Sequence, residues 1–470
     1  MSRHLVWLRL DLRSRDHAAL QAACRDPDSE VVAVYLHTPG QSARHDLGAR
    51  RSAFERDALA ALQPTLARLG IPLVQAELDD YAAIPAWMVE RVRAWGIGAI
   101  HAHRALEIYE QRRDEAVAAA VATEACRLCL YDDVCILPPG RVLTRDGRPF
   151  TVFSAFKKAW LQQLPTVAAA QPQPRPRRQH FLPLCAEPTP VKPQEQDWPA
   201  GEAAALAALD AFVAQGLADY AWARDRCDLA GSSRLSPYLT LGCLSARQCL
   251  HALYRQGPVD APGAASWLNE LCWRDFYKHI LVAFPQVGRH QAFQAATDAL
   301  PWRYDELEFA RWREGRTGFP IVNAGMRQLL QTGWMHNRLR MICASFLAKD
   351  LFIDWRWGER HFMQHLLDAD LAANNGGWQW SASTGNDAVP YFRVFNPWLQ
   401  SRKVDPQGHF IRQYVPELAA VQEVHTPVLR HADYPAPMLD HGQARQRVIA
   451  HFRALRGDSA QLGLWADDGS

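Results

Sequence analysis

The run VVAVYLH, Val31–His37, is a clear strand signal in the first part of the chain. Three similar runs accompany it, and segments with apolar residues at helical spacing lie between and after them. This alternation predicts an α/β fold with a doubly wound parallel sheet. The strand-like runs are His4–Leu10, Val31–His37, Pro72–Glu77 and Ala99–His103, and the helix-like runs are Ala18–Cys24, Arg51–Leu69, Ile84–Trp95 and Glu110–Cys126.

Two glycines and two missing motifs refine this prediction. Gly70 and Gly96 follow helix-like runs and are expected at helix C-caps. Neither Gly-x-Gly-x-x-Gly nor a P-loop occurs in this region, so the two common nucleotide fingerprints are not available. In such sheets ligands bind outside the carboxyl ends of the strands.

The composition of the 470 residues is that of an ordinary globular protein, with 48% hydrophobic and 22% charged residues. The net charge is only +2, so any contact with nucleic acid must come from a local basic patch. Trp is the unusual residue, because 12 of the 17 lie from Trp222 onward. The C-terminal part is therefore predicted to be a separate, Trp-rich region.

A change of composition predicts the domain boundaries. Between Val167 and Pro199 the chain is rich in Pro, Gln and Arg, as expected of an extended surface connector, and helical patterns dominate from Gly201. We expect an α/β domain over residues 1–130, a connector over 131–200 and an all-helical domain over 201–470. No long regulatory tail is expected after Arg456.

The chain is expected to be cytoplasmic. Arg and Asp interrupt the apolar run at the N-terminus, and no uncharged stretch is long enough to span a bilayer. Cys126 and Cys129 have CxxC spacing, which allows a zinc or redox site, but no second CxxC follows and their context resembles a helix. Ordinary reduced thiols and no metal site are expected.

The stretch DADLAANNGGWQWSASTGNDAVPYFRVFNP, Asp368–Pro397, is the most informative for function. It has almost no aliphatic residues, so it lacks the period of a core helix or strand. Small residues let a flat ligand approach the backbone, Asn and Asp supply oriented hydrogen bonds, and Trp supplies planar surface. A binding segment is favoured over a polar loop with chance aromatics.

Three more segments carry candidate chemistry. Gly231–Ser236, GSSRLS, precedes a helical run that its hydroxyls can cap, and it can present N–H groups to a phosphate. Glu270 lies three and four residues before Trp273 and Arg274 and can share a helix face with them; an Arg274–Asp275 surface ion pair is the structural alternative. In TGWMHNRLRM, a buried Asn337 is expected one helical turn from Met341, with Arg340 beside them, where it can hydrogen-bond a base edge.

These motifs, together with RLDLRSRD near the N-terminus and WLNELCWRDFY, resemble the class I cyclobutane pyrimidine dimer DNA photolyases of the photolyase/cryptochrome family. The resemblance runs from Leu5 to about Leu418. It implies an N-terminal α/β domain joined to a helical domain that holds FAD. Arg340 paired with Asp368 would stabilise a reduced anionic flavin, and Asn374 would face flavin N5. The implied FAD contacts are Tyr220, Ser232, Ser233, Arg234, Leu235, Ser236, Trp267, Arg274, Arg340, Asp368, Asp370 and Asn374.

The implied reaction is light-driven repair of cyclobutane pyrimidine dimers in DNA by electron transfer from excited reduced FAD, by a protein expected to be monomeric. Such enzymes flip their target base out of the duplex. Catalysis would involve Asn374 and the pocket residues Glu270, Trp273, Asn337, Met341 and Trp380. Trp378, Trp355 and Trp302 match the family's electron chain from flavin to surface. The residues implied in DNA binding are Arg224, Glu270, Trp273, Asn337, Arg338, Arg393, Gln400 and Lys403.

The antenna region matches the family less well. His45 and Glu110 correspond to residues of folate-binding members, but Tyr109 stands where those members carry Asn. Gly288-Arg289 also differs from the Cys-Lys of some members. A methenyltetrahydrofolate antenna is favoured, and a deazaflavin antenna or an empty site stays open. The alternative function is a cryptochrome-type photoreceptor, which predicts a divergent pocket and often a long C-terminal extension; a (6-4) photolyase would need a His pair where His336 is followed by Asn337.

Overall fold

A computed structural model describes residues 2–181, 198–427 and 433–461 of the chain. Its contacts define two compact units. Unit 1 comprises Met1–Ala218, Ser233–Pro285 and Leu367–Ala369, and unit 2 comprises Asp219–Ser232, Gln286–Leu366 and Asp370–Ser470. The boundaries expected at residues 130 and 200 stay predictions.

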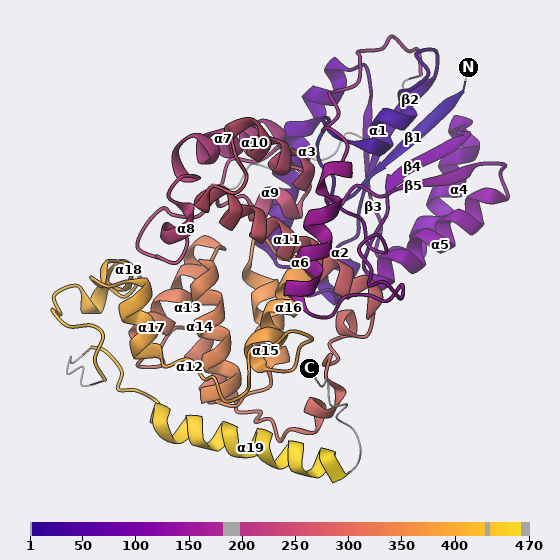
Figure 1. Cartoon of the computed structure of the whole chain (residues 1–470). Coiled ribbons are helices and arrows are strands. Elements are labelled where there is room, and N and C mark those ends of the chain that lie inside the picture. Colours follow the sequence, from indigo (N-terminus) through magenta and orange to yellow (C-terminus); the bar gives the residue numbers. More distant parts are fainter. Residues whose placement is uncertain (1, 182–197, 428–432, 462–470) are drawn as a thin grey trace. The chain divides into compact units, whose positions relative to one another are not determined.

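A five-stranded parallel sheet forms the centre of the N-terminal region (Figure 1). Its strands are β1 (Arg3–Leu8), β2 (Glu30–His37), β3 (Leu73–Glu77), β4 (Ala99–His103) and β5 (Arg127–Tyr131), in the order β3-β2-β1-β4-β5. Strand β1 lies at the point where the order reverses, because β2 and β3 are on one side and β4 and β5 on the other. The doubly wound parallel sheet expected from the sequence is therefore confirmed.

The sheet has one strand more than the sequence patterns predicted. The segment of Cys126 and Cys129 was expected to be helical, and this expectation was wrong. The helix before it ends at Ala122, Ala125 has a φ of 54°, and the chain then pairs with β4, with His101 opposite Cys129. An edge strand that is only partly buried carries a weak apolar signal, which explains the error.

Alternation along the strands builds the core on one face of the sheet. Leu5, Val32 and Ile100 point to this face and pack against helices α4 and α5, both on the same side of the sheet (Figure 1). Gly96 ends α4 in the left-handed conformation and Gly70 follows α3 with a φ of 74°, as predicted. The helices of unit 1 are α1 (Ala18–Ala23), α2 (Pro39–Arg44), α3 (Ala49–Arg68), α4 (Ile84–Trp95), α5 (Ile108–Ala122), α6 (Phe153–Gln163), α7 (Glu202–Ala211), α9 (Ser236–Thr240), α10 (Ala246–Gln256) and α11 (Pro262–Ala283).

The predicted connector is partly described. It contains α6, and residues 167–181 follow with little regular structure. Part of that segment is fixed to unit 1, since Val31 N–H donates to Gln179 Oε1 at 2.8 Å and Gln179 Nε2 donates to Val31 O at 2.9 Å. Residues 182–197 of the connector lie outside the described residues.

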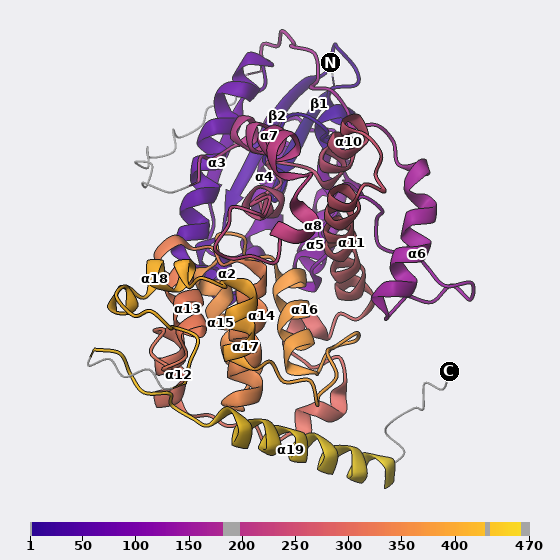
Figure 2. The same ribbon diagram turned by 60° about the vertical axis from the view of Figure 1, so that its left-hand side comes forward.

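Unit 2 is helical, as expected of the C-terminal region. Helix α19 runs below the other helices of this unit in both views (Figures 1 and 2), and His441 Nδ1 lies 2.6 Å from Asp350 Oδ1 of the short π-helix η6 (Phe346–Asp350). No helix in the described ranges is long and apolar enough to cross a membrane. The helices of unit 2 are α8 (Tyr220–Ala223), α12 (Glu306–Arg313), α13 (Pro320–Thr332), α14 (Asn337–Ser345), α15 (Trp355–His365), α16 (Leu371–Ala382), α17 (Pro397–Val404), α18 (His409–Tyr414) and α19 (His441–Gln461).

Candidate functional site

Helix α11 carries the predicted pocket residues of unit 1. Glu270, Trp273 and Arg274 occupy one face of it, as the spacing predicted. Phe153, the first residue of α6, stacks on the Trp273 ring with centroids 3.5 Å apart and an angle of 5°. One face of the Trp273 indole is therefore covered from inside the protein, and the side chain as a whole remains partly exposed.

The structural alternative for Arg274 does not hold. Asp275 is completely buried and accepts hydrogen bonds from the backbone N–H groups of Ile136 and Leu137 and from Trp160 Nε1. Arg274 Nη1 instead donates to the Val134 carbonyl at 2.8 Å, and it is 4.0 Å from Asp275. The two residues are thus not a surface ion pair, and Arg274 is held by the backbone at the end of the sheet region.

The candidate phosphate loop differs from its prediction in one respect. Helix α9 begins at Ser236, but its N-cap is Leu235, and no side chain caps it. The expected hydroxyl cap was wrong because Ser236 lies inside the first turn. Arg234, with a φ of 50°, extends its guanidinium over the Trp198 ring at 4.5 Å. An added Cβ on Gly231 would overlap the Ala223 carbonyl oxygen, so the start of the loop requires glycine.

Helix α14 carries the second pocket group, in unit 2. Asn337 is its first residue, and Asn337 Nδ2 lies 3.9 Å from Met341 Sδ. Asn337 is exposed, so the expectation of a buried Asn was wrong; the helix begins at the surface, capped by His336. Burial, followed by the charges of Arg338 and Arg340, lowers the pKa of His336 to about 4, so this cap is neutral at pH 7.

The informative stretch Asp368–Pro397 contains helix α16, although its sequence lacks an aliphatic period. Asp370 is the N-cap and accepts from Ala373 N–H at 3.1 Å. Asn374 Nδ2 donates to the Glu359 carbonyl at 2.9 Å, and Trp380 contacts Phe395 with ring centroids 6.3 Å apart. An added Cβ on Gly377, one turn after Asn374, would meet no atom within 4 Å. Open space therefore lies above this turn, as a flat ligand needs.

The three predicted electron-transfer residues are buried in unit 2. Trp302, Trp355 and Trp378 have exposed fractions of 7%, 0% and 2%, and none of their indole N–H groups has a hydrogen-bond partner among the described residues. The Trp378 ring sits against Gly358 of α15, where an added Cβ would overlap it. Buried donors without acceptors are rare and suggest a role other than stability.

The basic residues predicted for DNA binding also lie in unit 2. Arg338 Nε donates to Asp225 Oδ1 at 2.7 Å, so part of its charge is neutralised, and Arg224 lies over the Tyr220 ring at 5.5 Å. Arg393 and Lys403 are exposed, and Gln400 is half-exposed on α17.

Sequence analysis missed three apolar side chains beside these polar residues. Trp222, Phe392 and Leu399 are 57%, 53% and 62% exposed, next in sequence or nearly so to Arg224, Arg393 and Gln400. Large exposed apolar side chains beside basic residues suit contacts with bases and sugars. Their position within two residues of a predicted DNA-binding residue was a signal in the sequence. Their exposure, however, cannot be read from a single sequence.

The antenna candidates form a closed cluster in unit 1. Glu110 Oε1 accepts from the Tyr81 hydroxyl at 2.9 Å and lies 3.3 Å from His45 Nδ1, while Glu110 Oε2 is buried with no hydrogen-bond partner among the described residues. Burial opposes ionisation of Glu110, but His45, Arg113 and Tyr81 outweigh it and lower its pKa. The Tyr109 ring lies 5.7 Å from His45 and is 43% exposed.

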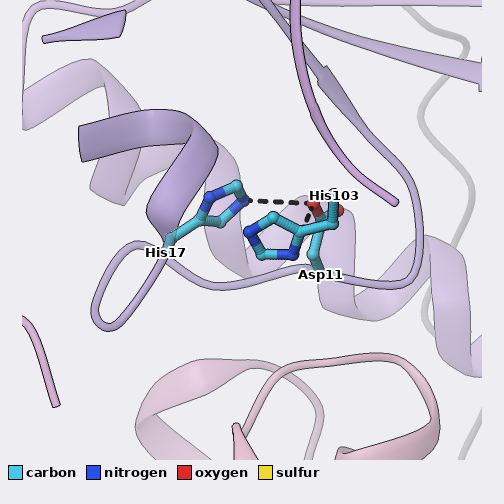
Figure 3. A group of neighbouring side chains, drawn as sticks. All are labelled: Asp11, His17 and His103. Carbon is cyan, nitrogen blue, oxygen red and sulfur yellow. Dashed lines mark ion pairs between the residues drawn. The ribbon is translucent and has the colours of Figure 1, made fainter. Parts of the chain in front are cut away.

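A second buried polar cluster lies in the same unit. Asp11, His17 and His103 are grouped so that their ligand-type atoms lie within 4.8 Å of one another (Figure 3). His17 Nδ1 accepts from Leu20 N–H as the N-cap of α1, so a neutral ring carries its proton on Nε2, the atom that faces Asp11 Oδ2 at 3.3 Å. A metal would need that nitrogen's lone pair. The cluster is therefore better described as the Asp11 carboxylate held between the two imidazoles than as a site for a metal cation.

Cys126 and Cys129 are free thiols. Burial, together with Cys129, raises the pKa of Cys126 to about 11, so this thiol stays protonated at neutral pH.

Comparisons with known proteins agree with this arrangement. The sequence profile described as DNA photolyase matches residues 4–177, and that of the FAD binding domain of DNA photolyase matches residues 267–454. Proteins named deoxyribodipyrimidine photo-lyase from Salmonella typhimurium and Escherichia coli are each 44% identical to this chain, over 97% of it and 99% of their own length. The chain belongs to the DNA photolyase family.

Solved structures of this family share the fold. A class III photolyase from Agrobacterium tumefaciens is 33% identical with a TM-score of 0.86, over 97% of this chain and 98% of its own. A Synechocystis cryptochrome is 28% identical with a TM-score of 0.84, over 96% of this chain and 99% of its own. An archaeal photolyase from Sulfolobus tokodaii, solved with two FAD molecules, is 27% identical with a TM-score of 0.81, over 96% and 100%.

Proposed function

We propose that this photolyase-family chain splits cyclobutane pyrimidine dimers in DNA under light, with FAD as its electron donor. The observation that carries the proposal is the pairing of Glu270 with a half-exposed Trp273 on one face of α11, the inner face of the indole being stacked on Phe153. A partly exposed indole supported by Phe153 and set beside a carboxylate suits a flipped base, which needs both stacking and an edge partner.

The donor set of the chain fits FAD. Hydroxyls of Ser233 and Ser236 and the guanidinium of Arg234 suit a pyrophosphate, because they offer hydrogen bonds and positive charge. Trp267 and Tyr220 are buried aromatic residues that we propose to line the FAD site. The open space above Gly377, beside Asn374, suits a flat ring. The other residues proposed to hold FAD are Ser232, Leu235, Arg274, Arg340, Asp368 and Asp370.

Bound and reduced FAD supplies the light-excited electron; the other tasks belong to the chain. Trp273 and Trp380 each offer an indole face, and stacking contributes about 1–3 kcal/mol per base. Glu270 and Asn337 hydrogen-bond the pyrimidine edges, which stabilises charge that develops on the substrate. Met341 packs against the substrate as a polarizable apolar contact. Arg224, Arg338, Arg393 and Lys403 bind phosphates and lose affinity as salt rises, with Gln400 beside them.

The test follows an oligothymidine with one dimer, mixed with the reduced holoenzyme and illuminated. Thymine absorbance should recover in light and stay unchanged in the dark. Trp273→Ala should repair poorly, whereas Trp87→Phe on the distant helix α4 should repair normally. A flavin-loaded, reduced protein that restores no thymine would favour the cryptochrome-type photoreceptor instead.

The antenna belongs to the proposal as well. We infer that His45, Tyr109 and Glu110 bind methenyltetrahydrofolate weakly, because Tyr81 engages Glu110 Oε1 and the remaining oxygen, Oε2, is buried. A deazaflavin is the alternative chromophore. Adding either to the holoenzyme and measuring energy transfer to flavin distinguishes them. A cytoplasmic monomer completes the proposal, and light scattering measures the oligomeric state.

A further inference from the structure

Trp378 has two aromatic neighbours in unit 2, and neither was among the predicted electron-transfer residues. Its ring contacts are with Phe362, 5.0 Å between centroids, and with Trp312, 6.0 Å at an angle of 71°. Among the described residues, no ring contact joins Trp378 to Trp355. Trp312 therefore lies next to Trp378 in the aromatic network.

The network continues from Trp312 to the surface. Phe309 stacks on Trp312 with centroids 5.6 Å apart and contacts Trp357 at 5.2 Å. Trp357 in turn contacts Tyr304 at 5.7 Å. Phe309 therefore lies between the rings of Trp312 and Trp357 and contacts both. This shared contact keeps the two indoles close to each other. The last member, Tyr304, is 64% exposed.

Tyr304 differs from every Trp of the predicted chain in having a proton acceptor. Its hydroxyl donates to Asp354 Oδ2 at 3.0 Å, within the range for proton transfer. By contrast, the indole N–H groups of Trp302, Trp355 and Trp378 have no acceptor among the described residues. An oxidised indole there keeps its proton and its positive charge, whereas an oxidised phenol beside a carboxylate loses its proton and traps the oxidising equivalent.

The position of the Arg356 guanidinium also disfavours an oxidised Trp355 relative to an oxidised Tyr304. It lies over the Trp355 ring, 4.8 Å from its centroid, so a positive charge on that ring is opposed by a like charge. Arg356 also pairs with Asp354 through Oδ1 at 3.2 Å, while Asp354 Oδ2 accepts from the Tyr304 hydroxyl at 3.0 Å. Trp312 has Phe309, Phe362 and His361 as neighbours, and burial, followed by the His365 and Arg313 charges, lowers the pKa of His361 to about 3, so this imidazole is neutral.

We propose that Tyr304, with Asp354 as its proton acceptor, is a surface electron donor connected to Trp378 through Trp312, Phe309 and Trp357. The inference rests on the proposed photochemical function. With oxidised FAD bound, Trp378 would supply one electron under light. An electron then moves inward at each step, from Trp312 to Trp378, from Trp357 to Trp312, and from Tyr304 to Trp357.

The step at Tyr304 is balanced by its surroundings. Tyr304 loses one electron to Trp357 and its phenolic proton to Asp354, which leaves a neutral tyrosyl radical and a protonated carboxyl group. A soluble thiol then donates a hydrogen atom to the exposed phenoxyl radical and becomes a thiyl radical, and Asp354 releases its proton to solvent. The Trp355–Trp302 route ends at an indole whose N–H is buried.

The test uses the holoenzyme with oxidised flavin, illuminated without thiol and examined by EPR. Wild type should give a tyrosyl radical signal, and Tyr304→Phe should lose it. Tyr254→Phe removes another exposed tyrosine, 41% exposed on α10, and should keep the signal. A spin trap, located by mass spectrometry, should attach to Tyr304. A tyrosyl signal that survives Tyr304→Phe overturns the proposal.

Two further variants test the route and the proton. Trp357→Phe should lose most of the tyrosyl signal, while Trp302→Phe should keep it; the reverse result would overturn the route through Trp357. Asp354→Asn can still cap α15 but accepts no proton, so it should shorten the radical's lifetime. A chain that retains no flavin contradicts the proposed function, whereas one that forms tryptophanyl but no tyrosyl radical contradicts this inference alone.

Discussion

Around Glu110 in unit 1 the partly buried polar side chains contact one another. In unit 2 the buried indole N–H groups of Trp302, Trp355 and Trp378 have no hydrogen-bond partner among the described residues. Each missing hydrogen bond costs roughly 1 kcal/mol or more. Polar groups that already bind one another are stable without a ligand, and they must give up these contacts before they can bind one. The electron transfer proposed for Trp302, Trp355 and Trp378 explains why these buried indoles lack hydrogen bonds.

Trp378→Phe should have the largest effect, because both aromatic routes begin at this ring. Phe preserves most of the packing but is far harder to oxidise, so light-driven reduction of oxidised flavin should stop. Absorbance of the flavin under blue light with thiol measures it. The control is Trp87→Phe, a partly buried Trp in unit 1. Photoreduction at the wild-type rate would show that electrons bypass Trp378.

Gly358→Ala tests how tightly the indole region is packed. An added Cβ at Gly358 would overlap the six-membered ring of Trp378, which is 2% exposed and has no room to move. Overpacking costs about 1–3 kcal/mol, more than the better helix propensity of Ala returns. Urea denaturation measures the loss. Gly377→Ala on α16 is the matched control, since its Cβ would meet nothing within 4 Å and should be tolerated.

His361 should make the indole region sensitive to acid. Its folded pKa is about 3, against an ordinary value of 6.5, because burial disfavours the charged ring. A lowered histidine pKa gives stability that is complete above pH 6.5 and is lost as the pH falls toward 3. At pH 5 the loss relative to pH 8 should be about 2 kcal/mol for this residue. His361→Phe should flatten the dependence by that amount; an unchanged slope would assign it to other groups.

The sequence predicted the elements whose signals are local. Four strands, the ends of α3 and α4 at Gly70 and Gly96, and the shared face of Glu270 and Trp273 follow from periodicity and capping. Helix α16 could not be predicted from periodicity, because Asn375, Trp378 and Gln379 stand on its buried face in place of large aliphatic residues. The Asp370 cap was the available signal.

Other features depend on residues far apart in the chain. The Phe153–Trp273 stack joins residues 120 positions apart, and the Tyr304–Asp354 hydrogen bond spans 50. No spacing rule relates such residues, so tertiary packing alone places them. The resemblance to the family identified the pocket residues but could not indicate Tyr304 or Trp357, because it carries over only positions that match a motif.

The smallest effect is expected at Tyr109, and it tests the closed cluster directly. Glu110 Oε2 is the one carboxylate oxygen of the cluster without a partner among the described residues, but it is buried, and Tyr109 covers the neighbouring His45. A folate pterin must reach that oxygen with its amino group. Tyr109→Asn removes the bulk and adds an amide, so one extra hydrogen bond becomes available. The gain should be about 1 kcal/mol, roughly a fivefold lower Kd for methenyltetrahydrofolate.

Titration of the holoenzyme with folate, followed by energy transfer to flavin, measures that change. Tyr109→Phe is the matched control, because it keeps the ring over His45 and loses only the hydroxyl, so its affinity should stay near wild type. Glu110→Gln should weaken folate in either background, since an amide nitrogen in place of Oε2 cannot accept from the pterin amino group. If wild type already binds folate tightly, Tyr109 turns away from the ligand and the cluster opens easily. If a deazaflavin transfers energy and folate does not, Glu110 Oε2 binds a different ring. The two regions then differ in the chemistry of the ligand each accepts, and not in whether their polar groups are already bonded.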